Sequence, residues 1–414
     1  HVYLVGKRIG TMSKTIRMSR SLLSVPGSGI RDVMSKSAAL KAAGKDVINW
    51  HIGRPDFDTP KHIKEACWEA LQQGHVHYAP AAGIPGLREA LAKRAEEEYK
   101  IAVDPERMIV CNGGMEAVTA VFHSLLEQGE GNEVIIPTPN WPNMKWAVVL
   151  AGGVPVEIPL VNGILTAKAI SSAVTDNTKA VVLASPANPL GSVTHLEELQ
   201  RIAKVVEEKD LLVISDETYT RLYYGEGSVA PSILSVEGME QRSFAVSTFS
   251  KTYAMDGWRL GWALCPDVSS ASAVAKTRYY FSSCSPTFTQ YAGIAALTDS
   301  QECVAEMLAE YDARRRILME GLANIPGVKL PSHPLGAYYV FPDLSAFGGA
   351  DGSLAKYLLD EHHIALVDGG VFGEEGQGHV RIAYSCSTEE CRRGVERLHH
   401  ALDSLKGKFL DSAK

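Results

Sequence analysis

The amino-acid sequence predicts an α/β fold, with a mostly parallel sheet covered by helices on both faces and a smaller α+β unit beside it. Between about residues 108 and 251, short apolar runs alternate with amphipathic stretches of helical length, as in strand–helix–strand units with buried strands. After about residue 300, long helical stretches flank two short strand-like runs. At 414 residues the chain is long enough for two or three units.

Each element is predicted from its own pattern. Apolar runs that end at glycine, proline or polar residues predict strands, and apolar residues at helical spacing predict helices. In the larger unit the predicted strands are 108–112, 132–139, 179–189, 211–219 and 243–251, and the predicted helices are 114–129 and 195–210. The second helix is predicted to be amphipathic. Its apolar face consists of Leu196, Leu199, Ile202, Ala203, Val205 and Val206. In the smaller unit we predict helices at 304–325 and 388–408 and strands at 336–344 and 379–385.

The chain is expected to divide near residues 50 and 297. We expect residues 51–297 to form the large unit and residues 298–414 the small C-terminal unit, with residues 12–50 packed against the small one. Residues 1–11 precede Met12 and are expected to be an added segment foreign to the natural chain. The basic, serine-rich stretch after Met12 has the composition of a transit peptide.

Composition narrows the classes of function. The 41 basic and 48 acidic residues give a formal charge of −7, which argues against nucleic acid as a partner. No apolar run approaches the ~20 residues of a membrane span, so no membrane partner is expected. The seven cysteines form no C-x-x-C pair, which predicts reduced thiols in a cytoplasmic protein and neither a disulfide framework nor a metal site.

Polar residues stand at the ends of four predicted strands of the larger unit, after residues 112, 185, 215 and 247. In open α/β sheets ligands bind beyond the carboxyl ends of the strands, so these positions are candidate site residues. They are Gly113 and Gly114, then Asn188, then Asp216 and Tyr219, and finally Thr248, Ser250, Lys251 and Arg259. Taken singly, each has an ordinary interpretation: a tight turn for the glycines and Asn188, a helix cap for Asp216, and solvated charges for Lys251 and Arg259. These ordinary interpretations explain the whole set less well, because the residues stand at successive strand ends.

Pyridoxal 5'-phosphate is a ligand whose groups match this set. Its aldehyde requires a lysine amine, and its pyridine nitrogen requires a carboxylate that keeps the ring protonated. The phenolic oxygen requires donors such as an amide and a phenol. The phosphate requires backbone N–H groups at a helix start, hydroxyls and an arginine.

The sequence resembles the class I/II aminotransferases, the aspartate-aminotransferase-like branch of fold type I among pyridoxal-phosphate enzymes. The resemblance runs from about residue 20 to 400 and rests on the segments "HYAPAAGIPGLREAL", "SPANPLGSV", "SDETY", "SKTYAMDGWRLGW" and "GHVRIAYS". It implies a seven-stranded, mostly parallel sheet. The stretch that begins "SRSLLSVPGSG" is similar to the family's N-terminal segment, so we do not expect a transit peptide.

The resemblance also implies a role for individual residues. Lys251 is similar to the Schiff-base lysine, Asp216 to the partner of the pyridine nitrogen, and Asn188 and Tyr219 to the donors to the phenolic oxygen. The phosphate would be bound by the backbone N–H groups of Gly114 and Met115 together with Thr248, Ser250 and Arg259, and Trp141 would stack on the ring. Arg381 would bind the substrate α-carboxylate with help from the N–H of Gly53. Tyr78 would reach the phosphate of a second subunit, which implies a homodimer with shared active sites.

These roles imply a ping-pong aminotransferase that moves an amino group from an L-amino acid to a 2-oxo acid. A lyase, synthase or cyclase of the same fold would need the same residues, and this alternative stays open at the level of sequence. A ligand-sensing regulator is not expected, because such proteins carry a further DNA-binding domain and a basic charge. Motifs of other enzyme classes, such as G-x-x-x-x-G-K-[ST] and H-E-x-x-H, do not occur.

Three positions depart from the family pattern, namely Arg54, Leu190 and Asp256. Arg54 follows Gly53, so we consider two interpretations for it. One is a surface charge or an ion pair with Asp56 or Asp58. The other is that Arg54 receives a second anionic group of the substrate. Asp256 adds a negative charge near Arg259, and the sequence offers no function for it.

Overall fold

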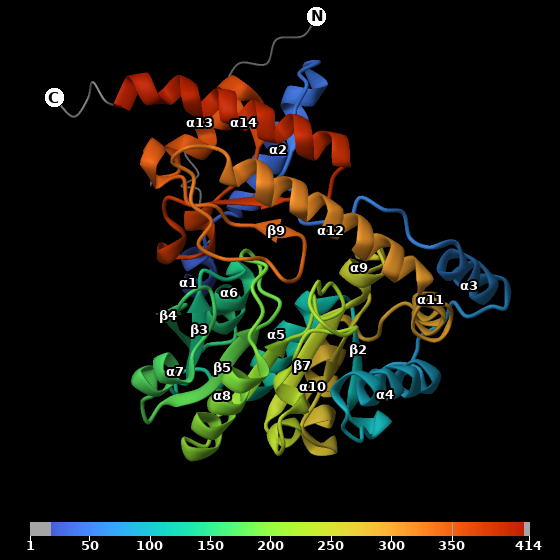
Figure 1. The fold of residues 1–414 in the computed structure, drawn as a ribbon. Helices are drawn as coiled ribbons and strands as arrows, with labels where there is room; N and C mark the ends of the chain where they lie inside the picture. The colour runs from blue at the N-terminus through green and yellow to red at the C-terminus, as the bar shows by residue number, and fades with distance from the viewer. Residues whose placement is uncertain (1–17, 350, 410–414) are drawn as a thin grey trace, which may run out of the picture.

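The computed structural model describes residues 18–349 and 351–409. The expectation for residues 1–11 therefore lies outside the described residues. Among those described, a seven-stranded sheet forms the centre of the larger part of the molecule (Figure 1). Its strands are β2 (Met108–Cys111), β3 (Glu133–Thr138), β4 (Val154–Pro159), β5 (Thr178–Ala184), β6 (Leu212–Asp216), β7 (Ser243–Thr248) and β8 (Gly261–Leu264).

The sheet is mostly parallel, as predicted. The strand order across it is β2-β8-β7-β6-β5-β3-β4. Neighbouring strands run parallel except at β8, which pairs antiparallel with both β2 and β7. Because β8 is antiparallel to both neighbours, β2 and β7 point the same way, and every strand except β8 shares one direction.

Both faces of this sheet are buried, which explains the nearly continuous apolar runs of its strands. Successive residues of a strand point to opposite faces. In β5, Ala180 and Val182 belong to one hydrophobic cluster, whereas Val181 and Leu183 belong to another on the opposite face. The predicted arrangement of helices over both faces is confirmed.

The helices divide between the two faces. The first face is covered by α5 (Gly114–Leu125), α6 (Pro142–Leu150) and α10 (Val268–Ser282). The opposite face is covered by α4 (Pro85–Tyr99), α7 (Ala167–Ala173), α8 (Leu196–Glu208) and α11 (Thr287–Thr298), and α3 (Lys61–Gln72) packs against α11. A short helix, α9 (Phe249–Thr252), directly follows β7. Among the described residues no helix is both long and apolar enough to cross a membrane.

The smaller part contains chain segments from both ends. Helices α12 (Glu302–Ala323), α13 (Ser353–His362) and α14 (Thr388–Phe409) lie around a sheet of β9 (Tyr339–Val340), β11 (Val367–Asp368) and β12 (Val380–Ala383) (Figure 1). From the N-terminal side come α2 (Gly29–Ala42) and β1 (Ile48–Asn49), and β1 pairs in parallel with β10 (Ile364–Ala365). Helix α1 (Arg20–Ser24) instead contacts α6 of the larger part. The exact division near residues 50 and 297 stays a prediction.

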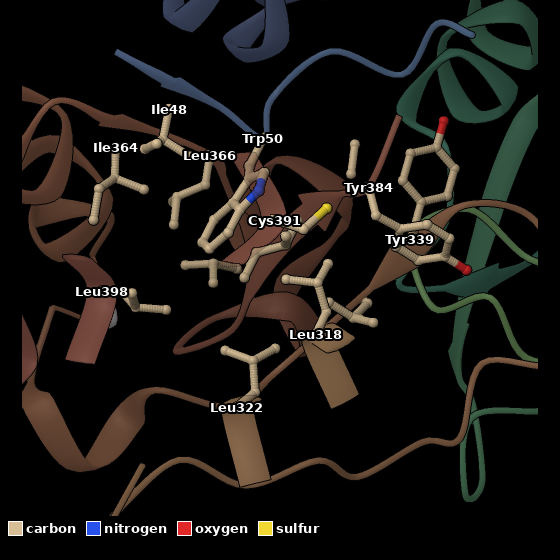
Figure 2. Packing of buried hydrophobic residues seen from close by; sticks show 14 of the residues in the cluster. Ile48, Trp50, Leu318, Leu322, Tyr339, Ile364, Leu366, Tyr384, Cys391 and Leu398 are labelled. Carbon is tan, nitrogen blue, oxygen red and sulfur yellow. The ribbon is translucent and has the colours of Figure 1, made fainter. Parts of the chain in front are cut away.

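Trp50 shows how these segments pack. Its indole is fully buried in a cluster with Leu318 and Leu322 of α12 and with Cys391 and Leu398 of α14 (Figure 2). Helix α14 approaches the ring at Gly394, where a Cβ atom would lie 2.1 Å from a ring carbon. This packing fixes the chain just before Gly53, one of the predicted site residues.

Some elements differ from the prediction. The strands β4 and β8 were not expected, and α5 ends at Leu125 because the next residue has an extended backbone. Leu196 is 43% exposed although it was placed on the apolar face of its helix. It occupies the first position of α8, where the side chain has not yet turned onto the sheet.

Candidate active site

The candidate site lies at one edge of the large sheet. The carboxyl ends of β2, β3, β5, β6 and β7 meet there because these strands share one direction. The antiparallel strand β8 instead begins at this edge, so the residue before it, Arg259, lies beside residues that follow the other strands. The reversed direction of β8 explains why the site contains a residue that precedes a strand together with residues that follow strands.

A cavity of about 280 Å³ lies at this edge. Every residue to which the family resemblance assigned a role, except Tyr78, lines it. They are Gly53, Gly114, Met115, Trp141, Asn188, Asp216, Tyr219, Thr248, Ser250, Lys251, Arg259 and Arg381. The order of their strands places Gly114 and Arg259 toward the β2 side of the cavity and Asn188 toward the β5 side.

The β2 end of the cavity is built for an anion. Gly113 has φ +85°, and a Cβ atom on it would lie 2.4 Å from Nη2 of Arg259, so only glycine fits there. Gly114 and Met115 begin α5, where backbone N–H groups have no partner within the helix. The hydroxyls of Thr248 and Ser250 lie 2.7 Å apart at the start of α9.

A network beneath this loop holds it in place. The backbone N–H of Asn112 donates to the Glu116 carboxylate, 2.5 Å away. The buried Arg278 places its Nε 3.2 Å from the same carboxylate and donates from Nη1 to the carbonyl oxygen of Ala81, 2.6 Å away. Glu116 therefore links the glycine loop to helix α10, although sequence patterns gave no sign of it.

Lys251 points into the cavity from α9. Its Nζ donates a hydrogen bond of 2.8 Å to the carbonyl oxygen of Gly53. Shielding from water lowers the pKa of Lys251 to about 8, with further lowering from Arg381 and Arg259, while Asp256 and Asp216 act in the opposite direction. A fraction of this amine is therefore uncharged near neutral pH, as a nucleophile or base requires.

Asp216 ends strand β6 and carries a buried carboxylate. Its Oδ1 accepts a hydrogen bond of 3.0 Å from the backbone N–H of Thr218, and no described residue forms an ion pair with it. Burial raises the pKa of Asp216. The carboxylate therefore faces the cavity without a compensating cation at contact distance, which suits a cationic group of a ligand.

Arg381 is a further charged residue of the cavity, and no described residue forms an ion pair with it. It is 2% exposed and donates to Oδ1 of Asn188 at 3.2 Å and to the carbonyl oxygen of His51 at 2.8 Å. Its guanidinium lies 4.6 Å from the ring centre of Tyr339 and 5.1 Å from that of Phe372. Neutral acceptors and aromatic faces leave its positive charge available to a carboxylate.

The lining residues that the sequence did not predict include Tyr339 and Asn140. The Tyr339 hydroxyl lies 2.7 Å from that of Tyr219, and a Cβ atom on Gly53 would lie 2.6 Å from it. Asn140 is buried, its Oδ1 accepts from the N–H of Trp141, and its Nδ2 has no hydrogen-bond partner among the described residues. A motif search could have found Asn140, which directly precedes Trp141. Tyr339 comes from a short strand far along the chain.

Two predicted features lie elsewhere. Tyr78 is 90% exposed and does not line the cavity of this subunit. Arg54 is exposed and lines a surface hollow that also contains Asp256 and that shares Arg259 with the cavity. The expected ion pairs of Arg54 are wrong, because Asp56 pairs with Arg314 and Asp58 pairs with Lys64.

The comparison with known proteins agrees with this geometry. Residues 45–398 match the family model of aminotransferase class I and II. The chain belongs to the class I and II aminotransferases. It is 40% identical over 397 residues to an aspartate aminotransferase of Pyrococcus abyssi, with 94% of this chain and 99% of the relative covered.

Solved structures of this family have the same fold. The aspartate aminotransferase of Thermus thermophilus with maleate superposes with a TM-score of 0.87 at 35% identity, covering 93% of this chain and 99% of that one. An aromatic aminotransferase of Pyrococcus horikoshii gives a TM-score of 0.83 at 38% identity, covering 89% and 99%. The predicted class of enzyme is confirmed: the protein is an aminotransferase of fold type I.

Proposed function

We propose that this aminotransferase holds pyridoxal 5'-phosphate in the cavity and transfers an amino group from an L-amino acid to a 2-oxo acid in ping-pong order. The observation that carries the proposal is a single cavity lined by a shielded lysine, a buried aspartate and a glycine loop with an arginine.

The cavity residues match the groups of the cofactor one by one. Lys251 would hold the aldehyde, Asp216 the pyridine nitrogen, and Asn188 and Tyr219 the phenolic oxygen. The phosphate would lie against the N–H groups of Gly114 and Met115, the hydroxyls of Thr248 and Ser250, and Arg259, with the ring against Trp141. The close approach of Arg259 to Gly113, which leaves no room for a Cβ atom, supports an anion site at this end.

When bound, the cofactor supplies an aldehyde that condenses with amines and a ring that withdraws electrons from the substrate Cα. Lys251 contributes a base, because burial keeps part of its amine uncharged and able to remove the Cα proton. Asp216 would hold a proton at the ring nitrogen, since a buried carboxylate is stabilised by an adjacent cation. The hydroxyls of Tyr339 and Tyr219, 2.7 Å apart, form part of the cavity wall.

The substrate would be oriented by its α-carboxylate. Arg381 offers two guanidinium nitrogens that now donate to neutral oxygens of Asn188 and His51. A carboxylate is a stronger acceptor than either oxygen, so it would take over part of this bonding. Gly53 lies beside the same place, and its N–H would add a further donor. The unpartnered Nδ2 of Asn140 adds another candidate donor.

A donor titration tests the transfer. The purified holoenzyme is mixed with an amino acid and no oxo acid, and the visible absorbance of the cofactor and the oxo-acid product are measured. We expect one equivalent of product per site, with turnover resuming when an oxo acid is added. Continuous turnover of the donor alone would show a lyase or cyclase instead.

We also propose a homodimer with shared active sites. The support is the exposure of large apolar side chains, which include Trp68 at 64%, Tyr78 at 90% and Tyr280 at 78%. Co-expression of Lys251→Ala with Tyr78→Ala chains would test sharing. If Tyr78 serves the partner's site, one site of each mixed dimer has both residues intact and recovers activity. A monomer in sedimentation analysis would exclude the proposal.

A cytoplasmic location is the remaining proposal. It is supported by seven free cysteines, which include the buried pair Cys386 and Cys391 with their sulfur atoms 3.6 Å apart. Cell fractionation with an antibody to the chain tests it, and recovery in a membrane or organelle fraction would contradict it.

A further inference from the structure

The proposed function assigns a role to each cationic residue that lines the active-site cavity among the described residues. Three cationic residues line the cavity, namely Lys251, Arg259 and Arg381. The proposal assigns them to the aldehyde, the phosphate and the α-carboxylate. Among the described lining residues no further cation remains for a second carboxylate of a dicarboxylic substrate.

A second cavity of about 630 Å³ adjoins the first and shares with it Met115, Asn140 and Trp141. Phe372 lies in the wall of this second cavity and also contacts the guanidinium of Arg381, with 5.1 Å between its ring centre and the guanidinium carbon. A substrate whose α-carboxylate lies on Arg381 would therefore have the second cavity beside its Cα. The side chain of the substrate can extend into that space.

The second cavity has a mostly apolar wall. Its larger apolar side chains are those of Val25, Trp141, Trp146, Leu150, Val371 and Phe372. These residues come from the segment before α2, from helix α6 and from the stretch after β11. Burying an aromatic or branched aliphatic side chain against them is favourable by about 25 cal/mol for each Å² of apolar surface removed from water.

The charges of this wall do not favour an anion. Nζ of Lys145, the cation of the wall, already forms an ion pair with Glu157. Asp368 adds a carboxylate whose Oδ1 accepts the N–H of Gly370 at 2.9 Å. Burial raises the pKa of Asp368. No described residue forms an ion pair with its carboxylate. Asn140, which lines both cavities, has an uncharged amide side chain. It therefore cannot neutralise the second carboxylate of a dicarboxylic substrate.

We infer that the amino donor is an L-amino acid with a large apolar side chain, aromatic or branched aliphatic, in preference to aspartate or glutamate. This inference rests on the proposed function, since it takes the α-carboxylate to lie on Arg381. The reaction is unchanged: the donor gives its amino group and Cα hydrogen to the oxo acid and receives the carbonyl oxygen. The chain is thus a large-neutral-amino-acid aminotransferase.

The test compares donors on the holoenzyme by kcat/KM. We expect L-phenylalanine and L-leucine to exceed L-aspartate and L-glutamate by about tenfold or more, since a side chain that fits an apolar pocket is worth about that much. Binding of unreactive analogues gives a second readout. Calorimetry is expected to show 3-phenylpropanoate binding more tightly than succinate.

A variant at Glu157 tests whether the charge of Lys145 faces the substrate side chain. Glu157→Gln removes the partner of Lys145 and leaves a free cation in the second cavity. We expect the ratio of kcat/KM for aspartate over phenylalanine to rise by about tenfold, and succinate to bind more tightly. The matched control is Asp210→Asn, which breaks the exposed pair with Arg242 at the opposite, amino end of β6. The control is expected to leave the ratio unchanged.

The outcomes separate the two proposals. A holoenzyme that prefers aspartate or glutamate over every apolar donor would overturn this inference and leave the proposed function standing. An unchanged donor ratio in Glu157→Gln would show that Lys145 does not face the substrate side chain, and so would refute the electrostatic argument. Absence of turnover with any donor, together with absence of bound cofactor, would overturn the proposed function itself.

Discussion

Nζ of Lys251 lies 2.8 Å from the carbonyl oxygen of Gly53, which belongs to a segment 198 residues earlier in the chain. The same oxygen accepts the hydroxyl of Tyr338 at 3.1 Å. The lysine is therefore held by a neutral oxygen and not by a carboxylate. Burial without a close counter-charge is what lowers the pKa of this amine to about 8.

The rate at which the apoenzyme takes up its cofactor should depend on this pKa. Below pH 8 the amine is mostly protonated and unreactive, and its free fraction falls about tenfold for each further pH unit. We expect the rate of cofactor uptake, followed by visible absorbance, to rise with pH and level off above about 8. A midpoint near the ordinary lysine value of 10.5 would contradict the assigned environment.

Replacing Asp216 by asparagine should separate binding from chemistry. The amide keeps the shape and the hydrogen bond from Thr218, but it cannot hold a proton on a ring nitrogen. We expect Asp216→Asn to bind the cofactor and to lose about a hundredfold or more in kcat, as found when a charge-stabilising group is removed. Equal losses in Asp216→Asn and in Thr218→Ala, which leaves the carboxylate in place, would indicate a structural role alone.

Arg381 should govern substrate affinity through the α-carboxylate. We expect Arg381→Gln to reduce kcat/KM by about a hundredfold, the order of a lost hydrogen-bonded charge contact, mostly through KM. Amines without a carboxylate should be unaffected, and this comparison separates recognition from misfolding.

Arg54 provides a matched arginine control for that experiment. It is exposed, and it lies in a hollow with the carboxylates of Asp56, Asp58 and Asp256. Arg54 lines neither the cavity of Lys251 and Arg381 nor the second cavity. We expect Arg54→Ala to leave the preference between dicarboxylic and neutral donors unchanged, and a fall in the dicarboxylic rate alone would revive the anion-site hypothesis.

Glu116 should affect cofactor binding without contacting the cofactor. Its carboxylate joins Arg278 to the backbone of Asn112, next to the glycines of the anion site. We expect Glu116→Ala to weaken cofactor affinity by about tenfold, and Glu116→Gln to retain part of it because one hydrogen bond survives. The readout is the dissociation constant of the cofactor. Glu130→Ala, an exposed change on the surface, is the control.

The site could be predicted from the sequence where its residues directly follow strands. Asp216 and Thr248 end β6 and β7, so the rule that ligands bind at strand ends places them correctly. Arg259 also lines the site, but for a reason that the sequence does not reveal. It precedes β8, whose antiparallel direction has no local signature in its four residues.

Tyr339 and Glu116 could not be predicted, because their roles depend on distant contacts. Tyr339 lies in a two-residue strand and meets Tyr219 only when the smaller part packs on the larger one. Glu116 looks like an ordinary acidic residue in the first turn of a helix. Its partner Arg278 is 162 positions away, so only the folded structure reveals the pair.

Reductive trapping identifies the lysine that holds the cofactor. The holoenzyme is reduced with borohydride, digested, and mapped by mass spectrometry. We expect one reduced pyridoxal phosphate covalently attached to Lys251, and we expect Lys251→Ala protein to carry none and to have no turnover. Label on a different lysine, or near-normal transamination by Lys251→Ala, would contradict it.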